Sequence, residues 1–364
     1  MELPQSVGKY VMNQWYAAAW SGEVTDKPFA RQMLDERIVL FRQGDGRIAA
    51  LTDRCPHRLA PLSMGDCVNG HLRCGYHGLE FNGAGDCVHV PGQAMIPPTA
   101  KTRSFPAVER YNLIWVWMGD RALADEALLP LVRKHGEPGW AVLDHGYQHH
   151  AANYRIEVEN LMDPAHTTFL HKQTIGNPAA KDEPVNVKRV DENGRKGIVA
   201  YRWLKNTPPS PFDRQSGAFS DGTKVDRGQF FAFFLPTVSL VEIVSMPSGL
   251  EYTDENMDRG LRTFSYKFLT PESEKATHFF WLHVRNYRVG DAEWETQLRI
   301  NLDKTYVEDN EMASAIQVEQ ERTGVRQFTA IAIDRAPVMA VREIEKMIAA
   351  EKGLAPDRAL EMAD

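Results

Sequence analysis

Two short loops in the first third of the chain each place a cysteine close to a histidine. The first loop reads Cys55-Pro56-His57-Arg58 and the second reads Cys74-Gly75-Tyr76-His77-Gly78, with sixteen residues between His57 and Cys74. Each loop therefore offers one thiolate and one imidazole. Any fold of this region has to present these four side chains together if they serve one site, and this requirement constrains the fold more than composition does.

Two cysteines and two histidines form the ligand set of a Rieske [2Fe–2S] centre, where thiolates bind one iron and imidazoles bind the other. Replacing two thiolates by imidazoles raises the reduction potential, which suits an electron relay. The alternative is a structural zinc ion in a tetrahedral site. Zinc fingers usually group Cys with Cys and His with His, whereas the two types alternate here. The remaining Cys67 and Cys87 are expected to be small buried or turn residues.

The sequence around these loops predicts short strands separated by turns. Residues 37–42 and 47–52 flank Gly44-Asp45-Gly46, which is a hairpin signal. A second hairpin is expected from residues 79–81 and 87–90, and a further strand at residues 113–118. Many short strands with Gly-rich turns indicate a small β-sandwich or barrel.

A second potential metal site lies in the stretch Asn160-Leu161-Met162-Asp163-Pro164-Ala165-His166-Thr167-Thr168-Phe169-Leu170-His171. Two imidazoles and one carboxylate suit a single metal ion that keeps coordination positions open. Around an ideal helix, His166 and His171 are about 140° apart. Both can reach one ion only if the helix is distorted or ends between them. The alternative is that Asp163 caps a helix that begins at Pro164, and that both histidines are ordinary polar or core residues.

These motifs together resemble the oxygenase component of Rieske non-haem iron oxygenases. The similarity runs over nearly the whole chain and includes residues 13–18, 108–117 and 285–287. The resemblance is strongest to the branch that contains vanillate O-demethylase, dicamba O-demethylase and toluenesulfonate methyl-monooxygenase.

The resemblance implies a role for each motif residue. Cys55, His57, Cys74 and His77 would hold the [2Fe–2S] cluster, and the mononuclear Fe(II) would be bound by His166, His171 and Asp309. Asp309 lies in a helix expected at residues 291–322, and spacing alone does not favour it over Glu308 or Glu311. Asn160 would lie close to the iron.

Asp163 would connect a ligand histidine, His166 or His171, with His77 of the partner subunit. This bridge implies a homotrimer in which each Rieske domain supplies electrons to the mononuclear iron of the next subunit. Such head-to-tail interfaces close into a ring. A carboxylate beside a ligand histidine orients the ring and tunes its basicity.

The expected fold is α+β, with an all-β Rieske domain at residues 13–120 and a catalytic domain at residues 121–364. Strands are expected at residues 228–244, 261–269 and 277–286, forming an antiparallel sheet. Helices at residues 291–322 and 335–351 would cover it. A helix is also expected at residues 121–132, and a Gly/Ser/Asp-rich, lid-like loop at residues 212–223.

Composition narrows the class of protein. The 364 residues carry a formal charge of −7, whereas nucleic-acid binders usually show a basic stripe. No secretory leader or membrane-spanning apolar run is visible, and four cysteines make no disulfide framework in a chain this long. A cytoplasmic protein is therefore expected.

The implied function is the oxygenase component of a multicomponent monooxygenase that hydroxylates or O-demethylates an aromatic, carboxylated and methoxylated substrate. Because no nucleotide-binding fingerprint is visible, a separate NAD(P)H-dependent flavin/iron–sulfur reductase would supply electrons. The same ligands would also serve a cis-dihydroxylating ring dioxygenase. An electron carrier with an inactive second domain belongs to another class. Glu242 and Lys267 fall where relatives place substrate contacts, and Lys267 could pair with an aromatic carboxylate, although a surface lysine is the commoner outcome for such a residue.

Overall fold

The computed structural model describes residues 9–172, 174–175, 177–192, 194–220, 222–325 and 329–353. The chain divides into two compact units. The first unit consists of Met1–Leu129 and Thr270–Ser273, and the second of Pro130–Leu269 and Glu274–Asp364. In the described ranges, no helix has both the length and the hydropathy that crossing a bilayer requires.

The first unit consists of three antiparallel sheets, with strand orders β1-β11-β10, β2-β3-β4-β9 and β5-β6-β7-β8. The strands are β1 (Trp15–Trp20), β2 (Phe29–Met33), β3 (Glu36–Arg42), β4 (Ile48–Thr52), β5 (Asp66–Val68), β6 (His71–Arg73), β7 (Glu80–Phe81), β8 (Cys87–His89), β9 (Ser104–Phe105), β10 (Ala107–Arg110) and β11 (Leu113–Trp117). Both predicted hairpins are confirmed, because β3 pairs with β4 and β7 pairs with β8.

The first unit extends beyond residue 120, where the sequence placed its end. The indole of Trp15 donates a hydrogen bond to the carbonyl of Asp125 at 2.8 Å, which ties the following segment to β1. The helix predicted at residues 121–132 is wrong, because this segment forms only the 3₁₀ turns η3 (Arg121–Leu123) and η4 (Glu126–Leu128). Asp120 and Asp125 each cap one such turn with a side-chain carboxylate.

The second unit is organised around a seven-stranded antiparallel sheet with the order β12-β18-β17-β16-β15-β14-β13. Its strands are β12 (Ala141–His150), β13 (Asn186–Glu192), β14 (Arg195–Thr207), β15 (Val225–Phe234), β16 (Val238–Pro247), β17 (Leu261–Ser273) and β18 (Ala276–Arg285). The last four residues of β17, Thr270–Ser273, are counted with the first unit. This sheet with its helices confirms the predicted α+β class.

The single strand predicted at residues 228–244 is wrong. The chain turns at Leu235-Pro236-Thr237, and β15 and β16 pair as a hairpin with Phe234 opposite Val238. Proline has no backbone N–H to donate to a ladder, so it ends the first strand. Because apolar residues lie on both sides of Pro236, the hydrophobic pattern did not reveal the turn between β15 and β16.

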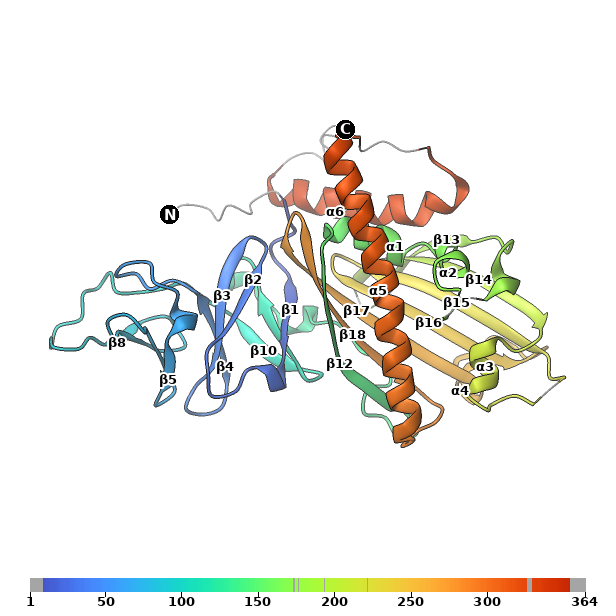
Figure 1. The fold of residues 1–364 in the computed structure, drawn as a ribbon, viewed down its shortest axis with the longest axis horizontal. Helices are drawn as coiled ribbons and strands as arrows, with labels where there is room; N and C mark the ends of the chain where they lie inside the picture. Colours follow the sequence, from blue (N-terminus) through green and yellow to red (C-terminus); the bar gives the residue numbers. More distant parts are fainter. Residues whose placement is uncertain are drawn as a thin grey trace. The chain divides into compact units, whose positions relative to one another are not determined.

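The helices are α1 (Tyr154–Leu161), α2 (His166–Phe169), α3 (Pro211–Gln215), α4 (Asp254–Arg259), α5 (Ala292–Thr323) and α6 (Arg335–Glu351). The helices predicted at residues 291–322 and 335–351 are confirmed as α5 and α6. In Figure 1, the long orange helix α5 lies across the sheet. It contacts β12 and α1, whereas α6 contacts α1 and β14.

Two capping residues set the length of α5. Asp291 accepts a hydrogen bond from the backbone N–H of Trp294 at its start, and Gly324 ends it in the left-handed region with a φ of 68°. Between these caps the helix spans 32 residues. One helix of this length, about 48 Å, can contribute side chains along a whole face of the sheet.

Gly146 tests the packing between β12 and β18. A Cβ at this position would lie 2.0 Å from the ring of Trp281, which is fully buried. We expect Gly146→Ala to lower the free energy of unfolding by about 1–3 kcal/mol, because the ring or the strand has to shift. Thermal unfolding measures this loss. Gly22→Ala is the control, since a Cβ there meets no atom within 4 Å, and an equal Tm for both variants would contradict the packing.

Candidate functional site: two metal centres and a pocket

The two cysteine–histidine loops of the first unit have the same backbone hydrogen bonds. The N–H of Cys55 donates to the carbonyl of Ala60, and the N–H of Cys74 donates to that of Leu79, both at 2.8 Å. Each cysteine thus begins a turn that closes five residues later. The two loops therefore present their side chains in matching ways, although their sequences differ.

The fifth residue of each loop has a left-handed backbone. Leu59 has a φ of 62° and Gly78 a φ of 75°, and the N–H of each donates back to the carbonyl of its loop cysteine. A bulky residue such as leucine is rarely found in this region, and such strain concentrates at functional sites.

The four side chains divide into a buried pair and an exposed pair. Cys55 and Cys74 are buried, whereas His57 and His77 are exposed, with ring centroids 4.6 Å apart. Burial, together with the neighbouring Cys74 thiol, raises the pKa of Cys55 to about 11. Metal-bound cysteines are thiolates, so a bound cation has to stabilise the charge that burial disfavours.

The arrangement argues against a single zinc ion. A tetrahedral zinc site brings its ligand atoms within about 4 Å of one another, given Zn–S and Zn–N bonds near 2.0–2.3 Å. Among the described residues, these four provide no group of three ligand atoms that all lie within 4.8 Å of one another. A two-iron cluster spreads its ligands over a longer span. Neither Cys67 nor Cys87 is in a disulfide; Cys87 in β8 is buried, as expected, whereas Cys67 in β5 is only partly buried.

The ligand segment of the second unit is a broken helix. After α1 ends, a carboxylate oxygen of Asp163 accepts the N–H of Ala165 at 2.7 Å. Then α2 makes one turn from His166 to Phe169 and ends before His171. The break predicted between the two histidines is therefore present, and it lets both imidazoles face the same point.

Three potential ligand atoms converge there. Nε2 of His166 lies 3.2 Å from Nε2 of His171, and Oδ1 of Asp309 lies 3.6 Å and 3.1 Å from these two nitrogens. Asp309 comes from α5, so ligands more than 130 residues apart in sequence meet at one position. Two neutral imidazoles and one carboxylate on one side leave the remaining positions open.

The electrostatics of this site suit a cation. Oδ1 of Asp309 is buried and has no hydrogen bond of acceptable geometry. Burial raises the pKa of Asp309, but the nearby His171 and His166 outweigh it and hold that pKa below its ordinary value. Burial lowers the pKa of His166 and favours the neutral, metal-binding imidazole. A buried carboxylate beside two imidazoles would be satisfied by a divalent metal ion.

From the sequence, Glu308 was only an alternative to Asp309, but the structure places it beside His171. Its Oε2 lies 2.8 Å from Nδ1 of His171 and accepts a hydrogen bond from the hydroxyl of Thr174 at 3.1 Å. With Nδ1–H donated to a carboxylate, Nε2 of His171 is the free ligand atom. No local sequence pattern separates Glu308 from the other acids of this segment, and only the contact with His171 does.

Asn160 and Asp163 flank the same site. The side-chain amide of Asn160 lies close enough to the carboxylate of Asp309 to help lower the pKa of Asp309. Oδ2 of Asp163 lies 3.8 Å from Nδ1 of His166, too far for a hydrogen bond within one chain. Nδ1 of His166 is itself buried without a hydrogen-bond partner.

A cavity in the second unit reaches these ligands. Its wall contains His166, His171 and Asp309 together with apolar side chains of β15, β16 and α5. Deep in the cavity, Nζ of Lys267 donates to Oγ of Ser265 at 2.7 Å.

This serine hydroxyl continues a chain of hydrogen bonds. Oγ of Ser265 lies 2.7 Å from Nε2 of His283, which lies 3.1 Å from the hydroxyl of Tyr306. A lysine only donates, so Ser265 accepts from Lys267 and its own hydrogen is free for His283. The cavity wall also contains Arg227, but its guanidinium donates to Asp213 at 2.6 Å, whereas the hydrogen bonds of Lys267 among the described residues go only to Ser265.

Lys267 lines the cavity, whereas Glu242 does not. Lys267 is 4% exposed and lines the cavity, so the alternative of a surface lysine is wrong. Glu242 does not line it, because its carboxylate accepts from Arg262 at 2.8 Å and from Arg133 at 3.3 Å. In β16 its side chain points to the sheet face opposite that of Val241 and Ile243, which line the cavity.

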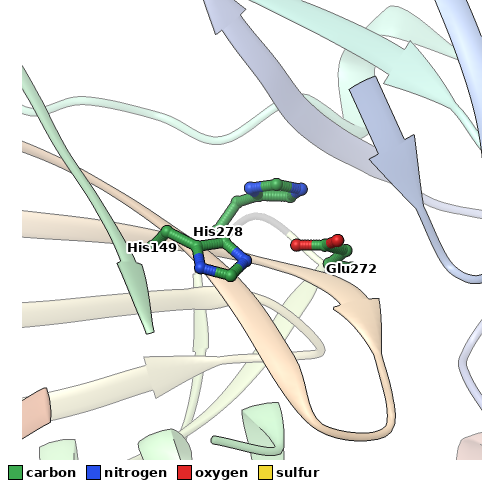
Figure 2. Close-up of side chains that lie close together, drawn as sticks. All are labelled: His149, Glu272 and His278. Carbon is green, nitrogen blue, oxygen red and sulfur yellow. The ribbon is translucent and has the colours of Figure 1, made fainter. Parts of the chain in front are cut away.

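A second pair of histidines lies at another place in this unit. His149 and His278 are directly paired on β12 and β18, with ring centroids 5.6 Å apart (Figure 2). Nδ1 of His278 lies 2.9 Å from the hydroxyl of Tyr147. Glu272, also labelled in Figure 2, belongs to the segment Thr270–Ser273 of the first unit. Among the described residues of the second unit, this pair has no third ligand.

Comparisons with known proteins match both units. The sequence profile of the Rieske [2Fe-2S] domain matches residues 14–106, and that of the vanillate O-demethylase oxygenase C-terminal domain matches residues 150–350. The chain is 35% identical over 343 residues to the vanillate O-demethylase oxygenase subunit of Pseudomonas sp. (strain HR199 / DSM 7063), covering 93% of this chain and 95% of that one. It is 37% identical over 348 residues to the oxygenase component of dicamba O-demethylase from Stenotrophomonas maltophilia, covering 93% and 98%.

Solved structures support the same family relationship. Dicamba monooxygenase bound to 3,6-dichlorosalicylic acid superimposes with a TM-score of 0.85 at 35% identity, covering 94% of this chain and 99% of that one. A structure of dicamba monooxygenase with non-haem iron and dicamba gives a TM-score of 0.78 at 34% identity, with the same coverage.

Glu308 provides a test of the mononuclear site. We expect Glu308→Ala to weaken Fe(II) binding about 10–100-fold, because His171 loses the carboxylate that fixes its ring and its tautomer. Iron release to a chelator measures this change. Glu311→Ala, which removes an exposed acid of the same helix, is the control. Equal release rates for the two variants would rule out this role of Glu308.

Proposed function

Because the chain belongs to the Rieske non-haem iron oxygenases, in the branch of the vanillate and dicamba O-demethylases, we propose that it hydroxylates or O-demethylates an aromatic substrate that carries a carboxylate and a methoxy group. It has a Rieske [2Fe–2S] domain and a His-His-Asp site for a non-haem iron, as in dicamba monooxygenase. A separate NAD(P)H-dependent flavin/iron–sulfur reductase supplies the electrons.

The observation that carries the proposal is the shared wall between the His-His-Asp site and the cavity. His166, His171 and Asp309 line the same space as Lys267 and Tyr306. A substrate in this cavity would lie against the open side of the metal site. A bound ferrous ion supplies dioxygen activation there, with electrons from the cluster. The electron-carrier alternative does not require a complete ligand set beside a cavity.

The geometry of the two loops and of the converging imidazoles and carboxylate supports our ligand assignments. We assign Cys55, Cys74, His57 and His77 to the [2Fe–2S] cluster. The buried cysteines would bind the inner iron, and the exposed histidines would bind the outer one. His166, His171 and Asp309 would bind the mononuclear iron through Nε2, Nε2 and the carboxylate.

Lys267 is assigned as the anchor of the substrate carboxylate. Its ammonium is fully buried and donates only to Ser265 among the described residues. A carboxylate on the substrate would remove the cost of an uncompensated buried cation and form a charge-assisted hydrogen bond. Because Lys267 lies near Asp309, a group next to the carboxylate on the ring would be held close to the metal site.

We also propose that the chain forms a homotrimer in which Asp163 links two subunits. Two observations support this link. Oδ2 of Asp163 lies 3.8 Å from Nδ1 of His166, and the exposed side chains of His57 and His77 leave the cluster site accessible to a second copy.

Product analysis tests the reaction. The purified protein is supplied with a compatible reductase, NADH and a panel of methoxylated and carboxylated aromatics. O-demethylation releases one formaldehyde for each phenol formed, whereas ring dihydroxylation gives a cis-diol and no formaldehyde. The proposal predicts formaldehyde where the methoxy group is attacked, and a monohydroxylated product where another carbon is. A cis-diol as the product would replace the proposal by the dioxygenase alternative.

His166 separates the roles of the two metal centres. We expect His166→Ala to abolish turnover, at least 100-fold, while the visible absorption of the [2Fe–2S] cluster stays unchanged. The mononuclear site loses one of three ligands, and the cluster loses none. Absorption spectra and turnover are measured on the same samples. Loss of the cluster absorption would contradict this division of roles.

Lys267 predicts a pH dependence of substrate binding. Burial, partly opposed by Asp309, lowers the pKa of Lys267 to about 7. Burial keeps the neighbouring His283 neutral by lowering its pKa, and it keeps Tyr306 neutral by raising its pKa. The ammonium is charged below this pKa, so the affinity for aromatic carboxylates should fall as the pH rises through about 7.

Lys267→Met should lower that affinity about tenfold or more at low pH, and it should remove the pH dependence. Titrations of the holoenzyme with 2-methoxybenzoate and with uncharged methoxybenzene measure both effects. An unchanged pH profile in the variant would exclude Lys267 as the anchor.

Asp163 tests the proposed bridge between subunits. We expect Asp163→Asn to retain most of its iron yet to reduce electron transfer from the reduced cluster about 100-fold, because the amide cannot replace a carboxylate between two imidazoles. Single-turnover oxidation of the reduced cluster measures the rate. Oxidation at the wild-type rate would remove Asp163 from the electron route.

A further inference from the structure

A buried arginine joins the metal-ligand segment to the wall of the cavity. Arg202 in β14 is 2% exposed. Its Nη2 donates to the carbonyl of Pro164 at 3.0 Å, its Nη1 to the carbonyl of Ala180 at 2.7 Å, and its Nε to Oε1 of Gln229 at 2.6 Å. One guanidinium group therefore holds two chain segments and one side chain.

This cation has no acidic partner in direct contact. Among the described residues, its hydrogen-bond acceptors are two backbone carbonyls and one amide oxygen. Burial lowers the pKa of Arg202, and the more distant charges of Asp163 and Glu183 oppose this effect. A buried, unpaired cation is costly for stability. The geometry that three fixed donors impose is therefore the better explanation for an arginine at this position.

The carbonyl of Pro164, which accepts from Arg202, lies in the turn just before the predicted ligand His166. Pro164 is two residues before His166, and its carbonyl also accepts the hydroxyl of Thr167 at 2.8 Å. Arg202 and Thr167 thus hold the start of α2 from two sides. Because α2 is a single turn, its direction depends on these bonds, and the ring of His166 takes its direction from α2.

The amide partner lies in the cavity. Gln229 is directly opposite Arg202 in the pairing of β14 with β15, and it lines the cavity. A guanidinium group only donates, so the atom of Gln229 that faces it must be the oxygen. This leaves the amide nitrogen of Gln229 as the atom that it can offer to a ligand.

We propose that Arg202 is a positioning residue that fixes the turn before His166, and that it orients Gln229 as a hydrogen-bond donor to a neutral oxygen of the substrate. The substrate would then carry an acceptor such as a hydroxyl, ether or carbonyl oxygen for Gln229, besides the acidic group for Lys267. The part concerning Gln229 rests on the proposed function, whereas the part concerning His166 does not.

Cobalt binding tests the part that concerns the metal site. The trimeric or monomeric protein, as purified with its cluster, is depleted of mononuclear metal and titrated with Co(II). We expect Arg202→Met to weaken Co(II) binding about tenfold or more and to change its visible spectrum, because His166 is no longer held in place. The absorption of the [2Fe–2S] cluster and the thermal unfolding curve report whether the fold is retained.

Two further variants make this result specific. Arg202→Lys keeps the charge but cannot reach all three acceptors, so it should bind Co(II) with an affinity between wild type and Arg202→Met. Gln229→Leu should bind Co(II) as wild type does. Wild-type affinity and spectrum in Arg202→Lys and Arg202→Met would overturn the proposal, as would a Gln229→Leu variant that loses as much affinity as Arg202→Met. If Arg202→Met does not fold, Arg202→Lys decides the outcome.

Steady-state kinetics test the part that concerns the substrate. The probe is the compound of the product-analysis panel with the highest kcat/KM. Gln229→Leu should raise its KM about three- to tenfold with a smaller effect on kcat, because one neutral hydrogen bond is lost. An unchanged KM would overturn the donor role of Gln229. If no panel compound is converted, the proposed function fails, and the cobalt titration still decides the role of Arg202.

Discussion

The structure depends on holding one buried carboxylate beside two imidazoles. Asp309 would be costly to bury alone, and the two histidines beside it come from the one-turn helix α2 (His166) and the residues just after it (His171), more than 130 residues earlier. The long helix α5 fixes the carboxylate, and the bonds to Pro164 and His171 fix the imidazoles. The sheet beneath them carries both arrangements and forms the cavity, so metal binding and substrate binding share one scaffold.

Besides the three metal ligands, the cavity wall contains hydrogen-bond donors, among them Lys267 and Gln229. The ammonium of Lys267 has no acceptor atom, and the amide oxygen of Gln229 already accepts from Arg202, so both side chains are placed to donate to a ligand. A substrate that fits has to bring the acceptors. This division suits an aromatic acid with a second oxygen, and it disfavours purely hydrocarbon rings, which would leave a buried ammonium uncompensated.

The sequence could predict what depends on short spacing. The two cysteine–histidine loops, the break between His166 and His171, and the long helix were all readable from local pattern. The choice of Asp309 over Glu308 needed the resemblance, although Asp309 falls on the buried face of α5 with Leu302 and Tyr306, a pattern that helical periodicity could have used.

Other features depended on contacts that are distant in sequence. The split of residues 228–244 into two strands was hidden because apolar residues lie on both sides of Pro236. The roles of Glu308 and Arg202 follow from partners in other elements, at His171 and Pro164, and no local pattern marks them.

The central claim is that one chain holds two separate iron centres, and the most direct measurement of it is the iron content per chain of anaerobically reconstituted protein. Two separate iron centres predict about three irons, two of them with acid-labile sulfide. About two irons, or zinc in their place, would contradict the account.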